Sequence, residues 1–245
     1  MKKTTSQGAK VVGGLVLAAA LVLGTAAQAT LSFSYVNNTG DNRNYTVSSS
    51  PAQVIPDGNP SGVAYALNFS GANQIVSVSV DLNITGGYNG DLYAYLSHGS
   101  QTLVLLDRVG VGTGSGAQYT FGYSGSSLAV TLADTGSGNI HNYGGGTPSG
   151  PYMADGQSTS PFATAGSFSS TGGSATFGNT FTSGSDPNGG WTLFFADLSS
   201  GGLSTLNSFN VNITAVPEPV TLALGLFVGM MLALWGLRRA WRPQA

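Results

Sequence analysis

The side chains that could perform catalysis in this chain of 245 residues are few. A Ser-His-Asp triad needs an imidazole that takes a proton from an activated serine, and the chain has two histidines, His98 and His141. We expect His98 in a turn and His141 in a glycine-rich loop, and no serine stands in a Gly-x-Ser-x-Gly pattern. Cysteine, the other common nucleophile, is absent. The sequence therefore predicts no protease centre.

Carboxyl groups are the other candidates, because glycoside hydrolases place two of them beside the scissile bond. Segment 30–216 has nine aspartates and no glutamate. Aspartate at turns and strand ends commonly accepts hydrogen bonds from its own backbone, which is a sufficient structural reason for such residues. We expect no catalytic residue in the chain and no enzymatic activity.

Some of these aspartates could instead bind calcium, because this hard cation prefers carboxylate and carbonyl oxygens as ligands. The candidates lie in or beside predicted loops: Asp91, Asp134, Asp155, Asp186 and Asp197. No Asp-x-Asp-x-Asp-Gly spacing occurs among them, so solvated loop aspartates are the competing interpretation. Calcium is the cofactor that the sequence suggests.

Tyrosines offer a third kind of site. Tyr93 and Tyr95 alternate with the apolar residues of 92–96, so both should project from the same outward face of a strand. Aromatic rings with a polar rim can stack on sugars, but outward tyrosines also stabilise sheets through cross-strand pairs. Glycan binding and sheet stabilisation both remain open at these two residues.

The charge of segment 30–216 is one-sided. Its cations are Arg43 and Arg108, it has no lysine, and its nine aspartates leave a balance of −7, which the whole-chain balance of −2 conceals. Such a surface cannot neutralise a run of phosphates, so nucleic acid is excluded as a partner. Without cysteine the segment forms no disulfide, and its stability must come from a hydrophobic core.

The first 29 residues have the order of a secretory signal peptide. Lys2, Lys3 and Lys10 precede the apolar run 11–23, and Ala27 and Ala29 supply the small residues of an Ala-x-Ala cleavage site. We expect the secretion machinery to export the chain and a peptidase to cleave it after Ala29.

The last 30 residues combine a short motif, an apolar stretch and a basic end. Pro217, Glu218 and Pro219 precede the uncharged stretch 220–237, which as a helix would span about 27 Å, close to the roughly 30 Å of a bilayer core. Arg238 and Arg239 follow, and basic residues beside a span tend to stay cytoplasmic. The sequence predicts a transmembrane helix at 220–237 that anchors an outward-facing domain, residues 30–215, to the inner membrane.

This arrangement of 216–245 resembles the bacterial PEP-CTERM sorting signal. The motif residues are Pro217, Glu218, Pro219, Arg238 and Arg239. The resemblance implies that an exosortase, a membrane-embedded transpeptidase of the cysteine type, removes the tail during export or attachment. It also implies a final place at the cell surface or in the extracellular matrix, because such proteins accompany exopolysaccharide and biofilm in Gram-negative bacteria.

Between the two ends, apolar and polar residues alternate as in strands that bury one face. The clearest stretch is 76–84, where Val76, Val78 and Val80 begin the apolar row. Further strands are predicted at 31–35, 63–69, 92–96, 103–106, 128–132, 175–177, 191–195 and 209–213. Many short strands separated by glycine-rich turns predict an all-β fold, a β-sandwich or jelly roll. The stretch 134–173 is longer than most compact loops, and we expect it to be either mobile or held by a ligand or ion.

From about 70 to 214 the sequence resembles the P domain, the jelly-roll module that follows the catalytic domain in proprotein convertases. Three segments carry the resemblance: VSVSVDLNI at 76–84, GDLYAYLSHGS at 90–100 and NGGWTLFFADLSSGGLSTLNSFNVNI at 188–213. The family often has a histidine before Gly-Asp-Leu, where this chain has Gly86 and Gly87, and His98 stands where the turn would carry proline. Trp191, Leu193 and Phe195 should face the core.

Taken together, these patterns predict a non-catalytic exported protein of the cell surface or exopolysaccharide matrix, with an exosortase as its processing partner. Two alternatives stay open. One is a module that binds a specific glycan through Tyr93 and Tyr95. The other, implied by the resemblance, is an accessory P-type domain that acts beside a separate protease.

Overall fold

The computed structural model describes residues 31–37, 42–124, 127–146, 148, 150–181, 185–217 and 226–235. The predicted signal peptide with Ala27 and Ala29 lies outside these residues, as do Glu218, Pro219, Arg238 and Arg239 of the sorting motif. Within the predicted span 220–237, a helix is described at 226–235. No described helix has both the length and the apolar character needed to cross a membrane.

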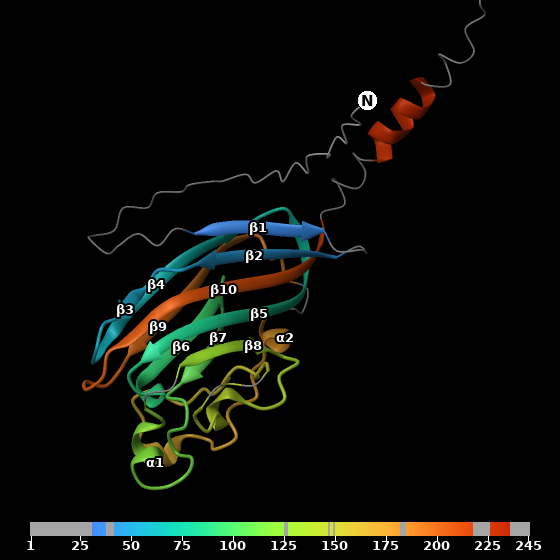
Figure 1. The fold of residues 1–245 in the computed structure, drawn as a ribbon. Coiled ribbons are helices and arrows are strands. Elements are labelled where there is room, and N and C mark those ends of the chain that lie inside the picture. The colour runs from blue at the N-terminus through green and yellow to red at the C-terminus, as the bar shows by residue number, and fades with distance from the viewer. Residues whose placement is uncertain are drawn as a thin grey trace, which may run out of the picture.

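The described chain is mostly antiparallel β-sheet, which confirms the all-β prediction. One sheet is built from six strands, which are β1 (Ser32–Asn37), β2 (Arg43–Ser49), β3 (Gln53–Ile55), β5 (Ala72–Gly86), β8 (Leu128–Ala133) and β10 (Ser204–Pro217). Figure 1 shows five of them side by side in the order β1-β2-β10-β5-β8, while β3 pairs with β10. The long β10 lies at the centre and joins the first strands of the chain to β5.

The second sheet has four strands in the order β4-β9-β6-β7. Its members are β4 (Asn59–Phe69), β6 (Leu92–His98), β7 (Gln101–Asp107) and β9 (Gly189–Asp197). Side chains from both sheets form one buried cluster, in which Tyr65 of β4 packs on Phe209 of β10 with ring centroids 4.8 Å apart. The two apolar faces therefore share a single core.

The alternation of apolar residues identified the buried faces of the main strands. Trp191, Leu193 and Phe195 of β9 are at most 1% exposed, which confirms their predicted place in the core. In β5 the pattern fails at Val76, which is 46% exposed while Ile75 is buried. The reason is a β-bulge in β5: the consecutive residues Thr214 and Ala215 of β10 pair with Ser77 and Ile75, so Val76 is the extra residue and the inward position moves from 76 to 75.

The strand predicted at 175–177 was wrong. The chain there leads into a short helix, α2 (Phe177–Phe181), whose first backbone N–H groups donate to the carboxylate of Asp134. Phe177 and Phe181 are fully buried on this helix, so their spacing of four residues follows a helical turn rather than a strand. A second short helix, α1 (Ala117–Phe121), lies at the end of the fold where several loops gather (Figure 1).

Three 3-10 turns complete the described elements: η1 (Asn89–Asp91), η2 (Ile140–Asn142) and η3 (Ala165–Ser167). The last two belong to the long stretch 134–173, which follows the edge of β7. There the N–H groups of Asp155 and Gly156 donate to the carbonyl groups of Leu105 and Val104, at 3.1 and 3.0 Å. This stretch thus continues the hydrogen bonding of the second sheet.

Candidate functional site

Three aspartates meet at the end of the fold that carries η1. Asp57 lies in the turn between β3 and β4, Asp91 ends η1, and Asp197 is the last residue of β9. In the sheet register Asp197 stands opposite Leu92, and the backbone N–H of Leu198 donates to the Asp91 carbonyl at 2.8 Å. Strand pairing therefore brings together carboxyl groups that are far apart in the sequence.

The carboxyl group of Asp197 is fully buried and interacts with the side chain of Ser204 and the backbone of Ser199. Asp91 is 3% exposed, and its carboxyl group interacts with the side chain of Ser199. Asp57, by contrast, is exposed, and its Oδ2 accepts a weak hydrogen bond from the N–H of Gly201 at 3.3 Å. The group combines two buried carboxyl groups with one at the surface.

Burial is the main cause that raises the pKa of Asp197 to about 6, and the charges of Asp91 and Asp57 raise it further. Hydrogen bonds from the Ser204 side chain and the Ser199 backbone act in the opposite direction. The pKa of Asp91 is also raised, chiefly by burial, while Ser199 and Arg108 lower it. Buried carboxylates without partners are costly in their charged form. At this end of the fold, burial therefore disfavours the charged form of both carboxyl groups, and the two serines partly offset that effect.

Ser204 and the loop before η1 border these carboxyl groups. The side chain of Ser204 is buried and interacts with the carboxyl group of Asp197. Gly87, at a φ of +60°, packs closely against it, because a Cβ at this position would lie 2.2 Å from the Ser204 Oγ and 3.2 Å from the Gly202 carbonyl oxygen. Only glycine combines this backbone angle with this close approach.

A second buried acidic group lies under the stretch 134–173. His141 and Asp155 are completely buried, and Nδ1 of the imidazole lies 2.8 Å from Oδ2 of the carboxylate. The same Oδ2 accepts the backbone N–H of Asp107 at 3.2 Å, and Gln157 donates to Oδ1 at 2.9 Å. Asp155, one of the predicted calcium ligands, is thus a structural partner of His141.

The carboxyl group of Asp107 has no hydrogen-bond partner for either oxygen and is fully buried. Burial, with a further contribution from Asp155, raises its pKa to about 7 against the opposing charges of His141 and Arg108. Asp107 stands opposite Tyr93 in the sheet register. Sequence reasoning gave this residue no role.

Both nitrogens of the His141 ring face acceptors: Nδ1 faces the Asp155 carboxylate, and Nε2 lies 2.8 Å from the Val111 carbonyl oxygen. A carbonyl oxygen and an ionised carboxylate both accept, so this geometry favours the protonated ring, in which both nitrogens donate. The bonds to Asp155 and Val111 raise the pKa of His141 against the lowering effect of burial. Neither nitrogen faces a serine hydroxyl, so this His-Asp pair differs from a Ser-His-Asp triad.

Both ring nitrogens of His98, at the C-terminal end of β6, also face acceptors. Its Nδ1 and Nε2 lie 2.9 and 2.8 Å from the carbonyl oxygens of Gly190 and Asp186, and its ring stacks on Trp191 at 4.3 Å. The predicted turn position is in fact the last residue of β6. Both histidines therefore hold loops in place.

The remaining predicted calcium ligands are separate from the three-aspartate group. Asp134 accepts the N–H groups of Phe177 and Gly178 at 2.9 and 2.6 Å, which fixes the start of α2. Asp186 accepts both the backbone N–H and the side-chain amide of Asn188, as in a turn. Of the five predicted residues, Asp91 and Asp197 come together, and Asp57 joins them.

Sequence reasoning missed Asp57, Ser204 and the pairing of His141 with Asp155. Asp57-Gly58 was recognisable as a turn dipeptide, but its neighbours come from loops that lie far away in the sequence. Among the described residues, no group of three or more His, Cys, Asp or Glu side chains is arranged so that it could hold a metal ion.

Tyr93 and Tyr95 do project from the same face of β6, as predicted. Their ring centroids are 6.1 Å apart, and Tyr95 stacks on Phe194 of β9 at 4.8 Å with an interplanar angle of 18°. The three rings are half-buried. They form an aromatic row, Tyr93, Tyr95 and Phe194, on the outward face of the four-stranded sheet.

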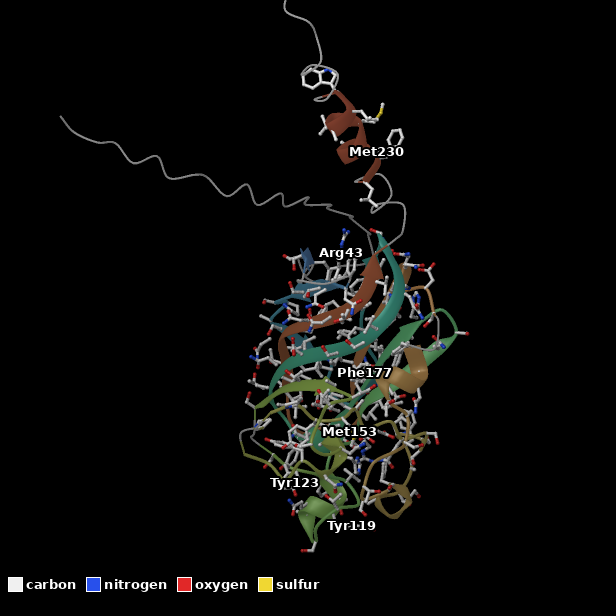
Figure 2. All side chains as sticks on the ribbon, turned by 90° about the vertical axis from the view of Figure 1, so that its right-hand side faces the viewer. Arg43, Tyr119, Tyr123, Met153, Phe177 and Met230 are labelled. Atoms are coloured by element: carbon white, nitrogen blue, oxygen red, sulfur yellow. The ribbon has the colours of Figure 1, made fainter. Side chains whose placement is uncertain are left out.

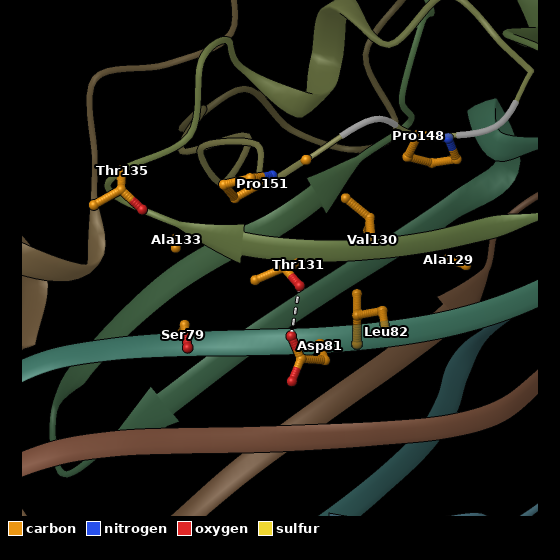
Figure 3. A pocket seen from close by; sticks show the side chains of 11 residues that line it. Ser79, Asp81, Leu82, Ala129, Val130, Thr131, Ala133, Thr135, Pro148 and Pro151 are labelled. Atoms are coloured by element: carbon orange, nitrogen blue, oxygen red, sulfur yellow. Dashed lines mark hydrogen bonds between the residues drawn. The ribbon is translucent and has the colours of Figure 1, made fainter. Parts of the chain in front are cut away.

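The outward face of the other sheet is polar and bears a groove of about 640 Å³. Figure 3 shows Ser79, Asp81 and Thr131 on β5 and β8 at its floor, with Pro148 and Pro151 beside it. Thr131 donates to Oδ1 of Asp81 at 2.7 Å, and the amides of Asn210 and Asn212 donate to Oδ2 at 3.2 and 3.0 Å. Both oxygens of this carboxylate accept hydrogen bonds, whereas those of Asp107 have no partner.

No protein-family model matches the chain, and no curated protein matches it. Among solved structures, it is similar to a chain in the complex of the Aeromonas sobria serine protease with the chaperone ORF2, with a TM-score of 0.36 and 14% identity over 77% of this chain. The serine protease of Aeromonas sobria gives a TM-score of 0.35 and 14% identity over 76% of this chain. The chain spans about a quarter of the length of both, 27% and 26%.

Proposed function

We propose that this chain is a non-catalytic exported protein of the cell surface or extracellular matrix, processed at its carboxy-terminal sorting motif. One observation carries the proposal: the last strand, β10, ends at Pro217, which is also the first residue of the Pro-Glu-Pro motif. The order of motif, apolar stretch and basic residues therefore follows the folded domain directly. An exosortase is the processing enzyme that this order implies.

The engagement of the two histidines supports a non-catalytic role. Each ring nitrogen of His98 and His141 lies within 2.9 Å of an acceptor in the protein. General-base catalysis requires a ring nitrogen that can take a proton from the attacking group. In this arrangement both imidazoles serve instead as links between loops and sheets.

We propose that the domain is a β-sandwich whose strands follow the jelly-roll order of the P domain. Two antiparallel sheets with one shared core support this assignment. A sandwich without cysteine or catalytic residues suits a protein that acts through its surface. Its working surroundings would be the exopolysaccharide of the matrix.

Fractionation of the cells that produce the protein tests this proposal. We expect the full chain in the surface or matrix fraction and a variant that lacks 218–245 in the medium, because that variant has no sorting tail. Detection of the full chain in the cytoplasm would contradict the proposal, and so would an unchanged distribution of the shortened variant.

A second candidate function, glycan binding, is favoured by the aromatic row of Tyr93, Tyr95 and Phe194. The three rings lie on one outward face and keep part of their surface accessible. Stacking of aromatic rings on sugar faces needs this kind of array. The pairing of Tyr95 with Phe194 across two strands also stabilises the sheet, so binding must be measured directly.

A further inference from the structure

We propose that the domain cleaves its own chain at the peptide bond between Asp186 and Pro187 in weakly acidic solution. This reaction goes beyond the function proposed above and does not depend on the sorting tail. The inference rests on one contact: Nε2 of His98 lies 2.8 Å from the carbonyl oxygen of Asp186, and that carbonyl group belongs to the peptide bond in question. Asp186-Pro187 is the single Asp-Pro sequence in the chain.

A peptide bond between aspartate and proline is chemically weak. The side-chain carboxylate forms a five-membered ring when it attacks the carbonyl carbon of its own residue, so nucleophile and target are held together in one residue. The leaving group is the nitrogen of proline, a secondary amine that departs easily once it carries a proton. Acid therefore breaks such a bond sooner than other peptide bonds.

The carboxyl group of Asp186 is already folded back toward this bond. Its Oδ1 accepts the backbone N–H of Asn188 at 2.9 Å and the side-chain amide of Asn188 at 2.7 Å. The first of these hydrogen bonds closes a ring of atoms that includes the bond between Asp186 and Pro187. Among the described contacts Oδ2 has no hydrogen-bond partner, and Asp186 is exposed. One carboxylate oxygen is thus available for attack, and water can reach the product.

His98 lies where a hydrogen-bond donor would assist the attack. Its Nδ1 is 2.9 Å from the Gly190 carbonyl oxygen, and the stack on Trp191 fixes the plane of the ring. Since both ring nitrogens face carbonyl oxygens, this geometry favours the protonated ring, in which both donate. Nε2 then stabilises the negative charge that develops on the Asp186 carbonyl oxygen. In this role His98 donates a hydrogen bond and takes no proton, which agrees with the engagement of both its nitrogens.

The reaction has two steps and consumes one water molecule. In the first step, a carboxylate oxygen of Asp186 bonds to the backbone carbonyl carbon of the same residue. The bond from that carbon to the Pro187 nitrogen breaks, and the nitrogen takes a proton from the solvent, which leaves a cyclic anhydride at Asp186. In the second step, water opens the anhydride. The products are a chain that ends in Asp186 and a chain that begins with Pro187.

The pH dependence of this reaction comes from Asp186, His98 and the leaving nitrogen. In the two sheet registers His98 stands opposite Gln101 of β7 and Trp191 of β9, and neither of these side chains titrates. The segment 186–190 contributes Asp186 as its one titratable side chain, and α2 contributes none. Lower pH favours both the protonated imidazole and a protonated leaving group, so cleavage should be faster in weak acid.

Cleavage would leave the fold assembled. The strands that follow the bond lie inside the sheets, β9 between β4 and β6 and β10 between β2 and β5. Before the bond, α2 packs on β9 through Phe181, whose ring centroid is 5.0 Å from that of Trp191. Figure 2 shows Phe177 of α2 at the side of the domain, between Arg43 near one end and Tyr119 at the other. The two parts of the chain would therefore stay bound to each other and separate only on denaturation.

The test is a time course of the full-length protein, purified in detergent and kept at pH 5 and at pH 8. Mass spectrometry should find one fragment that ends in Asp186 and one that begins with Pro187, formed at least tenfold faster at pH 5. The same protein unfolded in urea at pH 5 measures the lability of the bond alone, and the folded protein should cleave at least tenfold faster. Processing at the sorting motif gives a different terminus, so the two reactions are distinguished by mass.

Three variants assign the roles. His98→Phe keeps a ring to stack on Trp191 but donates no hydrogen bond, and it should slow cleavage by about 100-fold, the usual effect of losing one such donor. Asp186→Asn, at an exposed position, removes the carboxylate and should slow cleavage at least as much, and Pro187→Ala should do so by providing a poorer leaving group. Phe162→Ala, at a side chain that is 68% exposed, is the control and should cleave like the unaltered protein.

Equal rates in the folded and the unfolded protein would overturn the proposal, because the bond would then have only the lability of any Asp-Pro sequence. A folded protein that stays intact at pH 5 would also overturn it. An unchanged rate in a His98→Phe variant with native circular dichroism would contradict the role of the imidazole.

Discussion

His141 and Asp155 form a completely buried ion pair with 2.8 Å between Nδ1 and Oδ2, fourteen residues apart in a glycine-rich stretch. Because Nε2 of His141 also donates to Val111 and Asp155 accepts the N–H of Asp107, the pair joins the stretch 134–173 to the end of β7. A loop that looked either mobile or ligand-held from its composition is thus held by the protein itself.

Loss of this pair should destabilise the domain strongly. We expect Asp155→Asn to lower the free energy of unfolding by about 3–5 kcal/mol, the usual cost of leaving a buried charge without its partner. Urea unfolding measures this value, and limited proteolysis should show earlier cleavage within 134–173. Asp186→Asn, in an exposed turn, should change the free energy by less than about 0.5 kcal/mol. A loss below about 1 kcal/mol in Asp155→Asn would show that the pair does not hold the loop.

Asp107 gives the stability of the domain an unusual pH dependence. Its pKa is about 7 in the folded protein and about 3.9 in an unfolded chain, so between these values the folded state binds more protons. Stability should therefore fall as the pH rises from about 4 to about 7. His141, whose folded pKa is raised, acts in the same direction, because its contribution is lost as the pH rises through that value.

Urea unfolding at pH 5 and pH 8 in the presence of a chelator checks this dependence. The unaltered protein should be more stable at pH 5, and Asp107→Asn, which cannot ionise, should lose less stability between the two values. Greater stability of the unaltered protein at pH 8 would contradict the buried, unpaired state of this carboxyl group.

The core at Trp191 should be the most sensitive to truncation. Its ring packs against Phe69 and Phe181 at centroid distances of 5.9 and 5.0 Å, and its Nε1 donates to the Pro187 carbonyl at 2.9 Å. We expect Trp191→Ala to cost about 3–5 kcal/mol in denaturant unfolding. Phe162→Ala, at a side chain that is 68% exposed, serves as the control and should cost almost nothing. Similar losses in both variants would refute the central place of Trp191.

The aromatic row predicts a binding result. If Tyr93, Tyr95 and Phe194 recognise a glycan, the double variant Tyr93→Ala, Tyr95→Ala should retain at least tenfold less exopolysaccharide in a pull-down assay. Tyr119→Ala removes an exposed tyrosine of α1, outside the row, and should not change retention. Unchanged retention by a folded double variant would leave the row with a structural role alone.

The strands could be predicted from the sequence because alternation is a local signal. Polar and apolar residues alternate along β5, β9 and β10, and the structure buries the apolar side of each. Alternation alone does not reveal a β-bulge, which is why Val76, the extra residue of β5, was predicted to face the core. It also misread 175–177, where the buried side chains of α2 follow a helical turn.

The candidate site around Asp91 and Asp197 could be predicted only in part. Asp91 and Asp197 stood out by residue type and loop position, yet three of the five candidates proved to have separate partners. Asp57 and Ser204 join the site through the pairing of β10 with β3 and β5. Such contacts depend on the register of distant strands, and one sequence without its structure carries no local signal for them.

The central claim is that the chain is exported and sorted through its tail, and the carboxy terminus of the mature protein tests it most directly. Mass spectrometry should locate that terminus in cells with and without an active exosortase. We expect a new carboxy terminus near Pro217, Glu218 and Pro219 when the exosortase is active. When it is not active, the tail should still end at Ala245. An intact tail in both samples would contradict this claim.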